Sequence, residues 1–186
     1  AATLRRYHPK ATWWVAPQGF NAEWLNEFYS LIRANPAWLT GIVHGPQIRV
    51  PIGELRKQIP ARYPIRNYPD ITHTIRCQYP VPEWDTAFPL TLNHEPINPR
   101  PEFMRRIFHE ALPHTIGFIT YSEGCNDDVN KFLWSALGWN PDADLHETLR
   151  DYSRLFIHPR MAASFAEGLF SLERNWNGPL ATNTAV

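Results

Sequence analysis

Short apolar segments rich in β-branched and aromatic residues alternate with helical patterns along this chain. Strands are expected at residues 12–17, 39–43 and 62–66 and in the run that begins at Ile116, and each is followed by a loop and a helical pattern. Asn21 is expected to cap the first of these helices, and further helices are expected over residues 52–59 and 101–112. Strands that alternate with helices predict parallel βαβ units. The expected fold class is therefore α/β, with four strand-loop-helix units that make half of an eight-stranded (β/α) barrel or a small doubly wound sheet.

The 186 residues are long enough for about one domain with a proper core. We expect a barrel-like portion over residues 1–140, a C-terminal helical segment over 141–176 and a loose tail over 177–186. Residues 67–101 are rich in proline and aromatic side chains and show little periodicity. A stretch of this length is expected to be an ordered excursion at the active face, because long loops in compact domains usually carry function.

The most informative stretch runs from Ile116 to Trp134, and it predicts a strand, an acidic loop and a helix. Loops that follow the carboxyl ends of strands are where α/β proteins bind ligands and carry catalytic groups. Glu123, Asp127 and Asp128 place three carboxylates in this loop. The alternative is that both aspartates only cap the helix and that Glu123 is a solvated loop residue.

Four short motifs resemble the second half of hexosaminidase-like (β/α)8 glycoside hydrolase-type proteins. They lie at Trp38–Gly41, Tyr63–Asp70, Glu95–Pro101 and Tyr121–Gly124. The resemblance implies a barrel followed by a helical segment. In that family the paired catalytic acids follow the fourth strand, so a chain that is only the second half would lack the pair and would mostly bind sugar.

Glycoside hydrolysis needs a general acid and a second carboxylate across the scissile bond. Glu123 is the first choice for the acid, because partial burial beside an apolar strand would raise the pKa of its carboxyl group. Asp70 or Asp85 would supply the second carboxylate. The alternative for Asp70 is a turn residue that follows Pro69.

Several polar and aromatic side chains are candidates for sugar binding. Gln18, His44, Arg66 and Asn67 follow strands whose carboxyl ends would share one face. Trp84 beside Asp85 would pair a stacking platform with a hydroxyl acceptor, although a packed tryptophan beside a solvated aspartate fits equally well. The remaining candidates for this role are His73 and Asp127.

The composition argues against several other functions. A formal net charge of zero gives no sign of a nucleic-acid or anionic-membrane partner, and no apolar run approaches the length of a membrane-spanning helix. His44, His73 and His94 match no local metal motif, so no metal or other cofactor is expected. Ser122 lacks the glycine-flanked elbow of a serine nucleophile.

Two cysteines, Cys77 and Cys125, allow one disulfide but no disulfide framework. The chain opens without methionine, as a processed or partial chain would, and secretion or a periplasmic location after signal removal is one reading of this. The compartment stays open.

The function expected is that of a carbohydrate-active protein that hydrolyses glycosidic bonds through a loop carboxylate, with a glycan as its partner. The rival is a non-catalytic carbohydrate-binding or assembly segment of a larger glycosidase-like protein. A metal-dependent enzyme that uses the histidines is a third possibility. A half barrel would also expose unpaired strand edges, which predicts a homodimer or a complementary barrel half.

Overall fold

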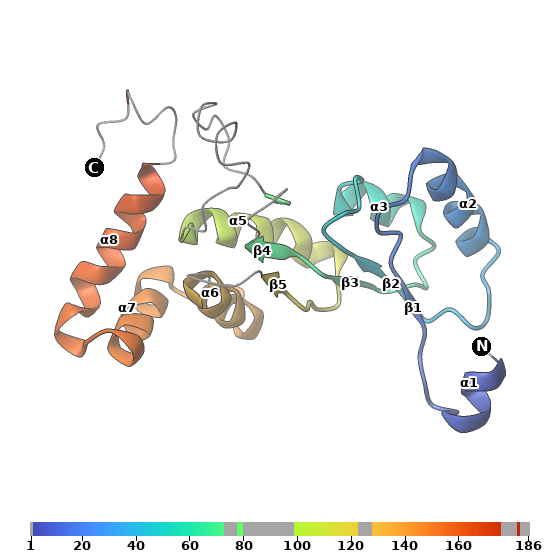
Figure 1. Cartoon of the computed structure of the whole chain (residues 1–186), viewed down its shortest axis with the longest axis horizontal. Helices are drawn as coiled ribbons and strands as arrows, with labels where there is room; N and C mark the ends of the chain where they lie inside the picture. The colour runs from blue at the N-terminus through green and yellow to red at the C-terminus, as the bar shows by residue number, and fades with distance from the viewer. Residues whose placement is uncertain (1, 73–77, 80–98, 123–127, 176–181, 183–186) are drawn as a thin grey trace. The chain divides into compact units, whose positions relative to one another are not determined.

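The computed structural model describes residues 2–72, 78–79, 99–122, 128–175 and 182 (Figure 1). The chain has a mixed α/β fold in which short parallel strands form two small sheets. Its contacts group into two compact units. The first contains Ala1–Pro69 and Ala111–Ile119, and the second contains Asp70–Glu110 and Thr120–Val186.

The first unit is built around a three-stranded parallel sheet whose strands lie in chain order, β1-β2-β3. Helices connect these strands, as the sequence predicts for parallel units. Its elements are α1 (Ala2–Tyr7), β1 (Trp14–Val15), α2 (Ala22–Arg33), β2 (Gly41–His44), α3 (Ile52–Gln58), β3 (Ile65–Asn67) and the short 3₁₀ helix η1 (Leu112–His114).

A fourth segment, residues 116–119, runs beside β3 in the parallel direction. The Ile116 N–H donates to the Ile65 carbonyl at 2.9 Å, and the Asn67 N–H donates to the Gly117 carbonyl at 2.9 Å. Ile119 in turn donates to the Asn67 carbonyl at 3.0 Å, so the bonds alternate between the segments as in a parallel ladder. Four parallel segments therefore lie side by side in the order in which they occur along the chain.

Helices α2 and α3 cover one face of this sheet (Figure 1). Phe28 and Ile32 of α2 and Leu55 of α3 are buried with Ile42 and Ile65 of the sheet. Each such aliphatic side chain contributes about 1.5–3 kcal/mol when fully removed from water. This shared core fixes both helices on the same side of the strands.

The structure confirms the predicted start of α2 and shifts the third strand. The Asn21 side chain accepts the Trp24 N–H at 2.8 Å and so caps α2. The third strand was predicted over residues 62–66, but it begins only at Ile65. Pro64 has no N–H to donate to the ladder, although its carbonyl accepts from Ile42 at 3.0 Å.

The second unit is mostly helical, with one small parallel pair of strands, β4-β5. Its elements are β4 (Asp70–Thr72), α5 (Pro101–Ala111), β5 (Tyr121–Ser122), α6 (Asp128–Trp139), α7 (Leu145–Phe156), the 3₁₀ helix η2 (Pro159–Met161) and α8 (Ala162–Arg174).

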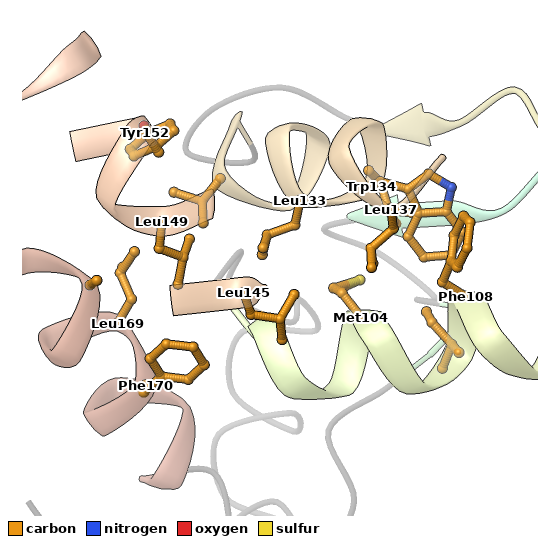
Figure 2. Close-up of a cluster of buried hydrophobic side chains, with 14 residues drawn as sticks. Met104, Phe108, Leu133, Trp134, Leu137, Leu145, Leu149, Tyr152, Leu169 and Phe170 are labelled. Carbon is orange, nitrogen blue, oxygen red and sulfur yellow. The ribbon is translucent and has the colours of Figure 1, made fainter. Parts of the chain in front are cut away.

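Side chains from four helices share the core of the second unit. Met104 of α5, Leu133 of α6, Leu149 of α7 and Leu169 of α8 point into one cluster (Figure 2). Phe108 packs edge-on against Trp134 with ring centroids 5.3 Å apart. Because α7 and α8 share this core with α5 and α6, the contacts of the second unit cut across the boundary expected at residue 140.

The predicted α/β class is thus observed, with strands of two to four residues. The described strands form two small sheets and no closed barrel. None of the helices that the structure describes has the length and apolar composition needed to cross a bilayer.

Candidate functional site

The carboxyl ends of β2 and β3 place His44 next to Asn67 in the sheet register. Both side chains are buried, with 5% and 3% exposed. The His44 ring donates through Nε2–H to the Val50 carbonyl at 3.0 Å, which anchors the loop that leads to α3. Within the described residues, His44 Nδ1 and Asn67 Oδ1 are buried without a hydrogen-bond partner. A buried polar atom that lacks a partner costs about 1–3 kcal/mol.

Burial lowers the pKa of His44, while the Val50 carbonyl and the Asn67 side chain oppose this shift. The ring is therefore neutral near pH 7, with Nδ1 as an acceptor. The structure thus brings two of the predicted sugar-binding residues together. They lie on the helix-covered face. Each stands two residues after Ile42 or Ile65, and side chains two positions apart in a strand point to the same face.

Gln18 lies in the loop after β1, as predicted, and its side chain approaches the end of β2. A Cβ atom at Gly45 would come within 2.9 Å of Gln18 Oε1 and 3.6 Å of the Tyr68 ring. The Tyr68 N–H donates to the His44 carbonyl at 2.7 Å. Gln18 and Tyr68 therefore approach the carboxyl end of β2 beside Gly45.

Arg66 was predicted to end the third strand and to join the other strand-end side chains, and the second of these expectations is wrong. It occupies the middle of β3 and points to the face opposite Ile65 and Asn67. Its guanidinium carbon lies 3.8 Å from the centroid of the Trp14 ring. That ring in turn covers Gly41, where a Cβ atom would come within 2.3 Å of it. Arg66 therefore belongs to a cation–π stack on this second face and not to the His44 strand end.

Asp70 lies in the second unit as the first residue of β4, so it is not a turn residue. It is 3% exposed, and its backbone N–H donates to Gln78 Oε1 at 2.9 Å. Burial raises the pKa of Tyr79 to about 12, and the charges of Glu110 and Asp70 add to the increase. Asp70 is thus a buried carboxylate whose charge acts on the nearby Tyr79 phenol.

Two buried polar residues of the same unit, Arg100 and Asn130, were not among the predicted site residues. Arg100 is 7% exposed and donates to the Tyr79 carbonyl at 2.5 Å, while its N–H donates to Asn130 Oδ1 at 3.3 Å. A buried arginine is uncommon and is usually engaged by specific partners. The position between Pro99 and Pro101 was the only sequence signal, since arginines are otherwise solvated.

A groove of about 1000 Å³ lies between α5, the turn before α7, and helices α7 and α8 of the second unit. We call it the helical groove. Its lining includes four arginines, Arg100, Arg105, Arg106 and Arg174. It also includes four carboxylates, Glu102, Asp142, Glu167 and Glu173. This volume is in the range of small-molecule sites, although the lining is far more charged than usual.

Glu173 is the best-anchored carboxylate of the helical groove. It accepts the N–H groups of Glu102 and Phe103, both at 2.9 Å, and so caps α5 from a distant part of the chain. Burial raises the pKa of Glu173, and the two N–H donors oppose the increase. Nearby, His146 donates through Nδ1 to Glu167 at 3.1 Å and stacks on Phe170 with centroids 4.2 Å apart.

The other predicted site residues lie outside the described residues. They are Glu123, Asp85, His73, Trp84 and Asp127, and Cys77, Cys125 and His94 lie outside as well. In the part of the chain that the structure describes, no three histidine, cysteine or acidic side chains gather as a metal site would require.

Comparison of the chain with family models, curated proteins and solved structures found no match.

Proposed function

We propose that this chain is a carbohydrate-active protein that hydrolyses glycosidic bonds, built on part of a (β/α) barrel. The observation that carries the proposal is the first unit's parallel order, in which β1, β2, β3 and residues 116–119 lie side by side in the order of the chain, although β4 of the other sheet comes between the last two. A (β/α)8 barrel has this sequential order, whereas doubly wound sheets reverse it at a switch point.

The polar strand end supports the same proposal. Barrel enzymes bind their substrates at the carboxyl ends of the strands, and His44 and Asn67 occupy two adjacent ends. Gln18 and Tyr68 approach the same end of β2 beside Gly45 and could bind hydroxyl groups there. In this proposal Glu123 acts as the general acid and Asp70 as the second carboxylate.

The test is a glycan screen on the purified chain that reads reducing-end release and binding in the same samples. We expect release from at least one glycan, and a loss of about a hundredfold or more in rate for Glu123→Gln, as for removal of a general acid. Asp70→Asn should also lower the rate. Asp151→Asn is the matched control, because this exposed aspartate only pairs with Arg154 at 2.6 Å on the surface of α7.

Binding without release would support the rival, a non-catalytic carbohydrate-binding segment. The Trp14–Arg66 stack is the observation that favours this rival, since aromatic and guanidinium planes on an open sheet face suit sugar binding without catalysis. If no glycan is either cleaved or bound, the carbohydrate proposal fails as a whole.

A further inference from the structure

The helical groove carries cationic side chains that the proposed hydrolysis does not use. Two of its arginines flank one aromatic ring, with guanidinium carbons 4.3 Å (Arg100) and 4.8 Å (Arg106) from the Phe103 centroid. Stacking on a ring orients a planar guanidinium. Arg100 is buried and donates to the Tyr79 carbonyl, whereas the N–H edge of the exposed Arg106 can meet a planar anion. The groove wall therefore presents donors in a fixed direction.

Three of the four carboxylates of the groove are engaged by other groups. Glu173 accepts two backbone N–H groups, Glu102 pairs with Arg105 at 2.8 Å, and Glu167 accepts from His146. These contacts satisfy negative charge locally and also occupy Arg105.

Arg106 is the cation that this arrangement leaves for a ligand. Its side chain is exposed and lines the groove. Within the described residues its contact is with the Phe103 ring, and no carboxylate lies within ion-pair distance of its guanidinium. An incoming carboxylate would accept two parallel N–H bonds from it, which is the strongest geometry that arginine offers.

We propose that the helical groove binds the carboxylate of an acidic sugar, in an oligosaccharide that contains uronic acid, with Arg106 as its principal contact. The choice of a sugar as the carrier of the carboxylate rests on the proposed function. The anion requirement rests on the groove alone. The groove volume of about 1000 Å³ accommodates a short oligosaccharide.

The experiment measures binding of short galacturonate, glucuronate and mannuronate oligosaccharides by titration calorimetry at pH 7 and low salt. The probes are compared with their methyl esters, which keep the sugar ring and remove the charge. We expect at least one uronate to bind, and its affinity to fall about tenfold or more in the methyl ester and in Arg106→Ala. Added salt should weaken the same complex.

Arg160→Ala is the matched control, because Arg160 is exposed in η2 of the same unit and is not among the groove residues. It should leave uronate binding unchanged, and far-UV circular dichroism of both variants checks that α5 and η2 stay folded. The proposal is overturned if none of the three uronates binds. It is also overturned if esters bind as well as acids, or if Arg106→Ala and Arg160→Ala behave alike.

The hydrolase proposal and the uronate-site proposal would be overturned by different results. Cleavage of neutral glycans with no preference for acidic ones would keep the hydrolase and remove the uronate site. Arg106-dependent uronate binding with no cleavage of any glycan would keep the site and remove the hydrolase.

Discussion

At the residue scale, Asp128 shows how a partner changes the role that a sequence suggests. The sequence indicates a helix-capping aspartate, and Asp128 is indeed the first residue of α6. Its carboxylate also accepts a short hydrogen bond from the hydroxyl of Tyr152 on α7. Burial and this carboxylate raise the pKa of Tyr152 to about 12. The aspartate thus links the start of α6 to α7 beside the core of the second unit.

Tyr152→Phe should therefore lower the free energy of unfolding by about 2 kcal/mol near pH 8, because a hydrogen bond to a charged acceptor is lost. The folded pKa lies above the ordinary value of 10.0, so the hydroxyl's contribution is complete below pH 10. It is lost as the pH rises towards 12, and the difference between wild type and variant should shrink over that window.

Urea unfolding followed by far-UV circular dichroism at pH 8 and pH 11 measures this difference. Tyr7→Phe is the control, since Tyr7 is 67% exposed. An unfolding free energy that Tyr152→Phe leaves unchanged at pH 8 would contradict the role given to this bond.

At the element scale, helices were predicted more accurately than strands. The pattern over residues 101–112 predicted a helix that the structure confirms as α5, and the pattern over 52–59 predicted α3. Helix periodicity and caps are local, because each turn is completed by residues within four positions. Strands of two to four residues depend on partners far along the chain, so the third strand begins later than predicted, at Ile65, and β4 at Asp70–Thr72 was not predicted.

Two glycines test how closely the elements pack. Gly41→Ala should lower the free energy of unfolding by about 1–3 kcal/mol, because its Cβ would overlap the Trp14 ring and push it away from Arg66. Gly168→Ala is the matched substitution in α8, where nothing lies within 4 Å of the new Cβ. It should raise the free energy of unfolding by up to about 1 kcal/mol through helix propensity. Thermal unfolding of both variants checks the opposite signs.

At the scale of the whole molecule, the first unit has an apolar strand-like edge. Residues 116–119 make their ladder bonds to β3 in the part of the chain that the structure describes. Ile116 and Ile119 are 64% and 66% exposed. An exposed apolar edge next to a parallel sheet is a template for pairing with another chain.

We therefore expect the purified chain to dimerise through this edge, with a mass in light scattering that rises with concentration. Ile119→Lys should shift the chain towards monomer, because a lysine on an edge discourages pairing. Leu155→Lys is the control, since Leu155 is 69% exposed on α7, away from the edge residues in sequence and in a different unit. A monomeric mass at every concentration would argue against dimerisation through residues 116–119.

The sequence by itself determined the α/β class, the parallel pairing of the strands and the helix cap at Asn21. It also predicted His44 and Asn67 as neighbouring strand-end residues, because parallel strands bring their carboxyl ends to one edge. These features follow from periodicity, chain direction and local hydrogen bonds, all of which can be read from neighbouring residues.

Only the tertiary structure decided which side chains are buried and which meet. Arg66 alternates to the face of Trp14, Glu173 caps a helix some 70 positions earlier in the chain, and Arg106 stacks on Phe103 at the wall of a groove. Such contacts join segments that are remote in sequence, so no local pattern encodes them. Their geometry depends on how whole helices pack, because the shape of the shared core sets which surfaces face one another.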